Sequence, residues 1–185
     1  NAIIPGCLVD AIVVAEPQER NEAYMALTGS FEIPYKEWHT WNEKINDLSQ
    51  KQRKNNIPAN IIGKRAAKEL RVDDIVNIGI GIPETVARFA RKSGMLDMIT
   101  LTVESGGIGG FPVSGEAFGA MIGAASVYDM ANQFDLYDNG GLDVCFMGAL
   151  EVDKYGNINA HRGTGAFAGI GGFANITAKT PTVVF

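Results

Sequence analysis

The sequence predicts an α/β protein whose sheet is mostly parallel, with helices on both faces. Short apolar, β-branched segments alternate along the chain with segments of helical periodicity, an order typical of parallel sheets. Glycine-rich turns follow several of the predicted strands. The 185 residues are 46% hydrophobic and 20% charged, a balance that favours a globular chain with a buried core over a disordered one.

The first part of the chain separates into a strand, an arm and a helix. Residues 7–14 (CLVDAIVV) are apolar and β-branched, so a buried strand is expected there. Residues 18–60 lose this periodicity and are rich in charged and amide side chains, which indicates a linker or surface arm. In residues 61–70 apolar side chains recur at every fourth position, which predicts an amphipathic helix.

A strand over residues 75–82 leads through a glycine turn into a helix over residues 83–92. Proline begins this helix and Glu84 lies in its first turn, both of which are helix start signals. The Gly79-Ile-Gly81 turn invites a dinucleotide-binding interpretation, but the third glycine of that fingerprint is missing. An ordinary tight turn is therefore favoured, and close approach of its backbone to another ligand stays open.

The remaining elements continue the alternation. A buried strand is expected over residues 98–103, and a closely packed helix within residues 114–132, which are rich in alanine and glycine. A further apolar strand follows over residues 142–152. Residues 164–176 are again glycine-rich, and a last strand follows Pro181.

Composition and charge exclude several functions. Sixteen basic and 21 acidic residues give a net charge of −5, without the basic stripe that nucleic acids require. No apolar run reaches the roughly 18 residues of a membrane span, so a cytoplasmic protein is expected. Cys7 and Cys145 have apolar neighbours and fit reduced core thiols. The two histidines, His39 and His161, belong to no cluster with metal-ligand spacing, so no metal site is expected.

Glu104 carries the sharpest chemical signal. It directly follows the strand predicted over residues 98–103, and glycine occupies four of the next six positions. Ligands of α/β sheets bind beyond the carboxyl ends of the strands, where such a carboxylate could attack an acyl carbon or act as a base. An acid at the end of a strand, bonded to loop amides, is the structural alternative of about equal weight.

Two later segments offer further candidate contacts. Asn157 could orient a ligand amide, although a turn-forming role is favoured for an asparagine beside Gly156. Gly171 and Gly172 would let the backbone pass close to a ligand, and tight packing or a hinge is the equal alternative.

Taken in order, five motifs resemble those of the family I CoA transferases, of the single-chain propionate or acetoacetate type. The resemblance covers residues 61–185 and implies that this stretch is the domain with the catalytic glutamate, truncated at its C-terminal end. It implies that residues 1–17 are the end strand of a preceding half. The five motifs are Val76–Pro83 (VNIGIGIP), Thr102–Gly110 (TVESGGIGG), Phe134–Asp143 (FDLYDNGGLD), Gly148–Asp153 with Gly156-Asn157, and Gly169–Phe173 (GIGGF).

The resemblance also implies a mechanism and a site. Glu104 matches the family's catalytic glutamate, which exchanges CoA between a short-chain acyl-CoA and a carboxylate through an acyl-glutamyl anhydride and a glutamyl-CoA thioester. The backbones of Ile80 and Gly81 are expected to bind the oxyanion. CoA is expected as a substrate, with no tightly bound cofactor. The residues expected to contact CoA or substrate are Gly106, Gly107, Asn157, Gly171 and Gly172.

The expected partners and the rival functions follow from the same resemblance. The family's working unit includes an N-terminal half or subunit that this chain lacks, so the chain is expected to be inactive alone, and a homo-oligomer is expected. One rival function is a CoA thioester hydrolase in which Glu104 acts as a base for water. The other is a noncatalytic domain that depends on a partner.

Overall fold

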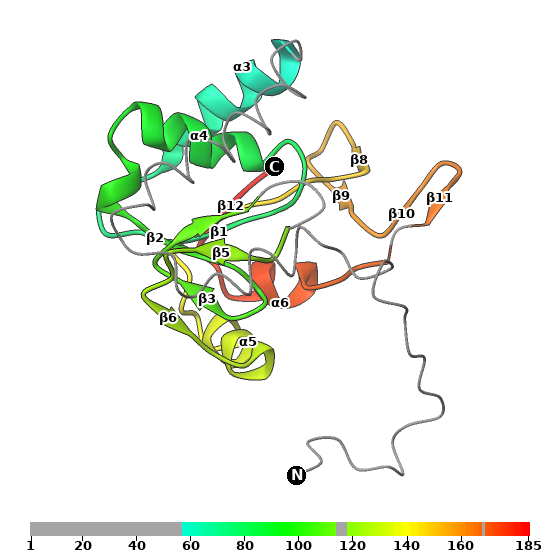
Figure 1. Cartoon of the computed structure of the whole chain (residues 1–185). Coiled ribbons are helices and arrows are strands. Elements are labelled where there is room, and N and C mark those ends of the chain that lie inside the picture. Colours follow the sequence, from blue (N-terminus) through cyan, green and yellow to red (C-terminus); the bar gives the residue numbers. More distant parts are fainter. Residues whose placement is uncertain (1–56, 114–117, 168) are drawn as a thin grey trace, which may run out of the picture.

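The computed structural model describes residues 57–113, 118–167 and 169–185 (Figure 1). The strand expected over residues 7–14, and all of the arm up to residue 56, lie outside the described residues. The last four residues of the expected arm are helical, because helix α3 (Ile57–Ala66) begins at Ile57. A short 3-10 helix, η3 (Ala67–Glu69), continues it, so the helix expected over residues 61–70 begins and ends earlier than predicted.

A six-stranded sheet forms the centre of the protein, in the order β12-β7-β1-β2-β3-β6. The first four strands in this order are parallel, β3 is antiparallel to β2, and β6 is antiparallel to β3 at the edge. This arrangement confirms the predicted, mostly parallel α/β fold. The strands are β12 (Thr182–Val184), β7 (Val144–Phe146), β1 (Ile75–Ile78), β2 (Thr100–Thr102), β3 (Gly107–Ile108) and β6 (Ser126–Val127).

Helices lie on both sides of this sheet (Figure 1). Helices α3 and α4 (Glu84–Lys92) lie on one side, and α5 (Met130–Asp138) and α6 (Phe173–Ala178) on the other. The two helices of the first pair approach closely at Gly63, where a Cβ atom would lie 2.0 Å from Thr85 Oγ1. Gly63 therefore permits the contact between α3 and α4.

Alternation along the strands divides the core into two apolar clusters. Val76 and Ile78 of β1 pack with Val86 and Ala90 of α4. On the other face Cys145 of β7 packs in a second cluster with Tyr137 of α5 and Ile176 of α6. Successive strand side chains point to opposite faces, so Asn77, between Val76 and Ile78, faces the second cluster.

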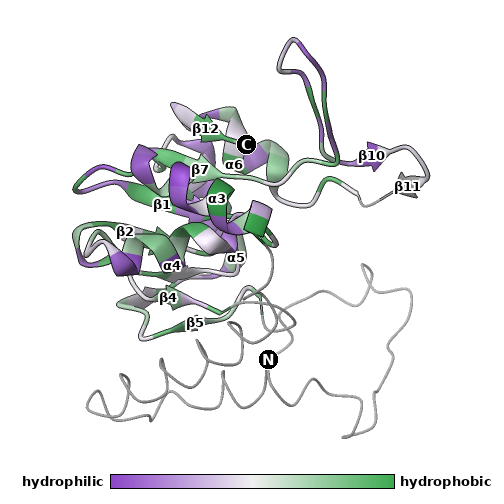
Figure 2. Cartoon of the chain, turned by 90° about the horizontal axis from the view of Figure 1, so that it is seen from above, coloured by the Kyte–Doolittle hydropathy of each residue, from purple (hydrophilic) through white to green (hydrophobic). Residues whose placement is uncertain are grey.

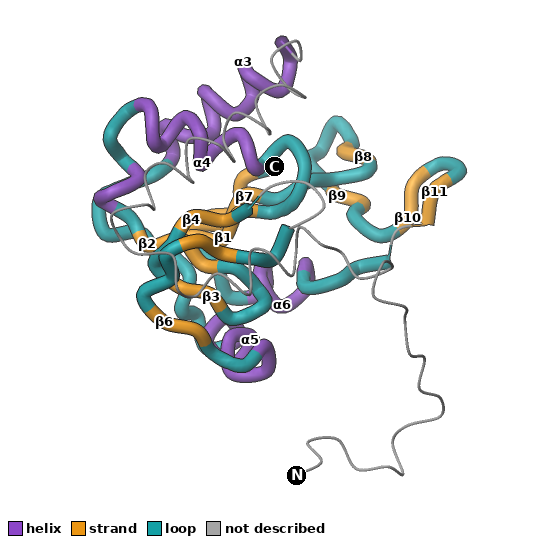
Figure 3. Tube along the Cα trace, in the orientation of Figure 1, coloured by secondary structure: helices purple, strands orange, loops and turns teal. Residues whose placement is uncertain are grey.

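The helix predicted within residues 114–132 is wrong. Strands β4 (Phe111–Pro112) and β5 (Met121–Ile122) pair antiparallel, and β6 follows before α5 begins at Met130 (Figure 3). Gly119 and Gly123 adopt positive φ values of 99° and 65°, which a helix cannot contain. Alanine-rich composition was therefore overridden by glycines placed at turns.

Two hairpins extend the carboxyl edge of the sheet. The strand expected over residues 142–152 is split: β7 ends at Phe146, and β8 (Glu151–Val152) pairs with β9 (Ile158–Asn159). Strands β10 (Arg162–Gly163) and β11 (Ala166–Phe167) form the second hairpin, which projects beyond the sheet in both views (Figure 1 and Figure 2). None of the helices in the described ranges has the length and apolar character needed to cross a membrane.

Candidate active site

Glu104 lies at the tip of a tight turn just beyond β2. The Gly106 amide donates to the Val103 carbonyl at 3.0 Å, and the Val103 amide donates to the Gly107 carbonyl at 2.9 Å, which closes the turn into β3. In the register of the sheet, Thr102 pairs with Asn77, and Asn77 also pairs with Cys145. The loops that follow β1, β2 and β7 therefore meet at one edge of the sheet, and Glu104 stands in the loop after β2, beside the loop after β1.

The carboxylate of Glu104 is half-buried, and burial raises its pKa above the ordinary value. Within the described ranges, no side chain or backbone amide donates a hydrogen bond to it. The structural alternative, in which loop amides donate hydrogen bonds to Glu104, is therefore not supported by the described residues. A partly desolvated carboxylate without donors keeps its lone pairs available, which suits a nucleophile or a base.

Gly172 lies directly against this carboxylate. A Cβ atom at Gly172 would be 2.8 Å from Glu104 Oε1 and 2.9 Å from Cζ of Phe134. Gly172 precedes the first residue of α6, and its backbone is in the ordinary helical region. Glycine is therefore needed at position 172 because a side chain would collide with Glu104, not because of the backbone conformation. At Gly171 the reverse holds: φ is +53°, and a Cβ atom there would have no neighbour within 4 Å.

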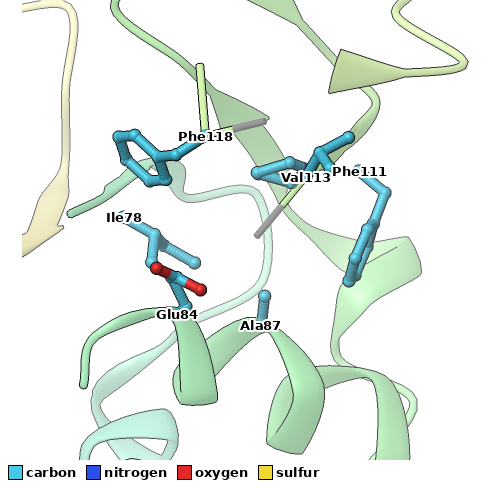
Figure 4. Close-up of a pocket in the computed structure, with 7 residues that line it drawn as sticks. Ile78, Glu84, Ala87, Phe111, Val113 and Phe118 are labelled. Atoms are coloured by element: carbon cyan, nitrogen blue, oxygen red, sulfur yellow. The ribbon is translucent and has the colours of Figure 1, made fainter. Parts of the chain in front are cut away.

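The loop after β1 places its amide against a different carboxylate. The Gly81 amide donates to Glu84 Oε1 at 2.6 Å. Figure 4 shows the Glu84 side chain pointing from α4 into a hollow that is otherwise apolar. Ile80, the other expected oxyanion donor, has a side chain that is 60% exposed. The residues that line the hollow with Glu84 are Ile78, Ala87, Phe111, Pro112, Val113 and Phe118.

Gly106 and Gly107, which we expected to contact substrate, are covered by protein. A Cβ at Gly106 would lie 1.9 Å from the Tyr128 carbonyl oxygen, and one at Gly107 would lie 2.9 Å from Cβ of Met121. Gly106 also has a φ of +113°, which favours glycine. Close packing of β3 against its neighbours therefore accounts for both glycines.

Asn157 forms part of the turn between β8 and β9. Its Nδ2 donates to Asp153 Oδ2 at 2.7 Å, and its backbone amide donates to Asp153 Oδ1 at 2.9 Å. These bonds, the side-chain bond from Asn157 first among them, lower the pKa of Asp153. The turn-forming role that the sequence favoured for Asn157 is what the structure displays.

A polar cluster beneath Glu104 was missed by the sequence analysis. Asn77, Thr102, Gln133 and Tyr137 are all at most 2% exposed, and hydrogen bonds join them. A signal was present, because Asn77 is the polar residue of the otherwise apolar strand β1. Another signal was the four-residue separation of Gln133 and Tyr137, which places them on one face of a helix.

Among the described residues, no three or more histidine, cysteine, aspartate or glutamate side chains are grouped so that they could hold a metal ion.

Glu104 should make the folded protein less stable at neutral pH than a neutral side chain would. Because its folded pKa is raised, protonated Glu104 contributes stability that is present below its ordinary pKa and is lost as pH rises through the raised value. We therefore expect Glu104→Gln to have a higher Tm than the wild type at pH 7, and the difference to shrink towards pH 4. Thermal unfolding across this pH range measures it, and a variant less stable at pH 7 would contradict it.

Cys145 should be unreactive in the folded protein. It is fully buried, and burial raises the pKa of its thiol to about 11, while a bond with Thr180 acts in the opposite direction. At pH 8 only about one thiol in a thousand would be ionised. In a Cys7→Ser variant, we expect the Cys145 thiol to react with a disulfide reagent only after denaturation, as followed by absorbance. Rapid labelling of the native protein would refute this.

Comparison with known proteins agrees with this arrangement. The sequence model of the family described as Coenzyme A transferase matches residues 59–169. The acetate CoA-transferase YdiF of Escherichia coli K12 is 37% identical over 185 residues, which cover 98% of this chain and 33% of YdiF. The acetate CoA-transferase subunit beta of the same strain is 38% identical over 107 residues, 52% of this chain and 48% of that subunit.

A solved structure is similar as well. The acyl-CoA transferase YdiF of E. coli O157:H7, determined as a thioester complex with CoA, matches with a TM-score of 0.61 and 37% sequence identity. The match covers 68% of this chain and 23% of that one. The chain thus spans about a third of the length of the full-length YdiF sequence that it matches. From the match to the family over most of the described residues, together with the identity to YdiF, we conclude that the chain belongs to the Coenzyme A transferase family.

Proposed function

We propose that this chain carries the nucleophile of an acyl-CoA:carboxylate CoA transferase and that the nucleophile is Glu104. One observation carries the proposal: a half-buried carboxylate without hydrogen-bond donors among the described residues stands at the carboxyl edge of the sheet, with the Gly172 backbone against it. Burial raises its pKa, and a more basic carboxylate is a better nucleophile once it is ionised.

In the first half of the reaction, CoA moves from the donor to the enzyme. A Glu104 oxygen attacks the thioester carbonyl, the carbon–sulfur bond breaks, and CoA leaves as a thiolate from an acyl-glutamyl anhydride. The thiolate then attacks the glutamyl carbonyl of the anhydride. The donor acid leaves as a carboxylate, and a glutamyl-CoA thioester remains.

The second half repeats these steps in reverse with the acceptor. The acceptor carboxylate attacks the glutamyl thioester and expels the CoA thiolate, which then attacks the acceptor carbonyl and frees Glu104 as a carboxylate. No proton is gained or lost overall, and the free energy of the thioester is conserved. Water must be kept from the anhydride, because hydrolysis would waste it.

The expected site residues take unequal parts in this proposal. Gly172 lets the Glu104 carboxylate lie against the backbone before α6, because a Cβ atom there would be 2.8 Å from Glu104 Oε1. The Ile80 amide is the donor proposed for the oxyanion, while the Gly81 amide is bonded to Glu84 and would serve only when that bond opens. Asn157 lies in the hairpin turn, from which it would meet the CoA moiety rather than the reacting carbon.

The substrates and partner that we propose are short-chain acyl-CoAs, a carboxylate such as acetate, and a second half or subunit that completes the pocket. The name of the relative YdiF supports acetate, and the name of the other relative, subunit beta, supports a partner subunit. We further propose that the complete unit is a homo-oligomer. CoA enters as a substrate, and no tightly bound cofactor is needed for this chemistry.

Trapping the covalent intermediate tests the function. The full-length natural protein is incubated with acetyl-CoA and reduced with borohydride, and the modified residue is mapped by mass spectrometry, with CoA release measured with and without added carboxylate. We expect modification at Glu104 and acyl exchange that requires the acceptor. Release of CoA without an acceptor would indicate a hydrolase, and neither modification nor binding would indicate a noncatalytic domain; either would overturn the proposal.

A further inference from the structure

Four buried polar side chains form a cluster beneath Glu104, which we call the Tyr137 cluster. It comprises Asn77 of β1, Thr102 of β2, and Gln133 and Tyr137 of α5. Tyr137 and Gln133 are fully buried, and the other two are no more than 2% exposed. The cluster therefore joins the two central strands to the helix on one face of the sheet.

The hydrogen bonds of this cluster run in one direction. Asn77 Nδ2 and Gln133 Nε2 donate to the Tyr137 hydroxyl oxygen at 3.3 and 2.9 Å. The Tyr137 hydroxyl donates to Thr102 Oγ1 at 2.9 Å, and Thr102 donates to the Val76 carbonyl at 3.0 Å. Because both donors are amides, the Tyr137 proton is directed to Thr102, which lies two residues before Glu104.

The ring of Phe134 connects the cluster with the surroundings of the Glu104 carboxylate. The pKa of Tyr137 is raised mainly by burial, and the negative charge of Glu104 adds to the increase. Phe134, one turn before Tyr137, packs edge-on against it with ring centres 5.9 Å apart. The ring of Phe134 also meets Gly172, the residue that lies against Glu104.

The cluster is costly as a purely structural device. Within the described part of the chain, Gln133 Oε1 is buried without a hydrogen-bond partner, which destabilises the folded protein because the desolvation of this oxygen is not compensated. Apolar side chains of similar size would fill this space without that cost. The neighbouring strand residues on the opposite face, Val76 and Leu101, are apolar, as expected of an ordinary core.

We propose that Tyr137 is a positioning residue for Glu104. Its hydroxyl, held by Asn77 and Gln133, fixes Thr102 and the end of β2, while its ring fixes Phe134 and, through it, the Gly172 backbone. The Glu104 carboxylate is thereby held in a fixed position relative to the Gly172 backbone and to the thioester carbonyl that it attacks. The inference rests on the proposed function and concerns the rate of the chemical steps, because misplacing a reacting group by about 1 Å can cost a hundredfold in rate.

The test is Tyr137→Phe in the full-length protein, which keeps the ring and removes only the hydroxyl. We expect kcat and the rate of Glu104 modification by acetyl-CoA to fall about tenfold to a hundredfold, with KM for both substrates changed less than twofold. Thr180→Val is the matched control, since Thr180 is a buried residue whose hydroxyl donates to the Ile176 carbonyl. It should lower Tm comparably and leave kcat within twofold.

A double-mutant cycle separates positioning from general loosening. Tyr137→Phe and Thr102→Val remove the same bond, so the double variant should lose no more kcat than the worse single one, and Thr102→Ser should keep most of the activity. If acetyl-CoA modifies Glu104 of the wild type and of the Tyr137→Phe variant at the same rate, this inference is overturned and the proposed function stands. If Glu104 of the wild type is never modified by acetyl-CoA, the proposed function is overturned, and this inference with it.

Discussion

Replacing Glu104 with glutamine is expected to abolish CoA transfer, with a loss of at least about a thousandfold in kcat. Glutamine has nearly the same size and keeps the turn after β2, but its amide cannot form the anhydride or the thioester. Transfer of CoA from an acyl-CoA to acetate, followed by chromatography of the two thioesters, measures the effect. Because the charge is lost, the variant should also be no less stable than the wild type at pH 7.

Glu104→Asp is the matched variant for this prediction. It keeps the carboxylate but withdraws it by one methylene from Gly172, so about a hundredfold loss is expected, with a trace of the covalent intermediate still detectable. If Glu104→Gln retained more than a few per cent of the activity, Glu104 would not be the nucleophile.

Gly172→Ala is expected to reduce kcat by about a hundredfold while the protein stays folded. The added Cβ would lie 2.8 Å from Glu104 Oε1 and 2.9 Å from Phe134 Cζ, so the carboxylate and the Phe134 ring must shift from their positions. The backbone at Gly172 has a φ of −76°, which alanine adopts without strain. The effect is therefore steric and local to the site.

The control for Gly172→Ala is Ala174→Ser, which also adds one heavy atom two residues further along but on an exposed position of α6. Its kcat should lie within twofold of the wild type. Thermal unfolding distinguishes a local effect from a global one. A Gly172→Ala protein with full activity would show that CoA transfer does not need the carboxylate of Glu104 to lie against the Gly172 backbone.

Local signals predicted the helices and strands that have strong patterns. Helix α4 begins at Glu84, one residue later than expected, and the strand expected after Pro181 is β12. The chain order of strands and helices was enough to predict a mostly parallel sheet, because crossover connections of this kind produce parallel pairing. Local signals failed where glycines at turns outweighed alanine composition, as in the segment that forms β5 and β6.

Local sequence was enough to single out Glu104 as the reactive candidate, because a carboxylate after a buried strand and before four glycines can be recognised without any distant residue. The glycines that surround Glu104 could be identified from the folded protein alone. Gly106 and Gly107 stand beside Glu104 in sequence but pack against Tyr128 and Met121, whereas Gly172, 68 positions away, lies against its carboxylate.

Only the tertiary structure, likewise, revealed the Tyr137 cluster. The physical reason is that sheet register and the packing of α5 set these distances, and both depend on contacts between residues far apart in the chain. Spacing along one segment carries no record of such contacts.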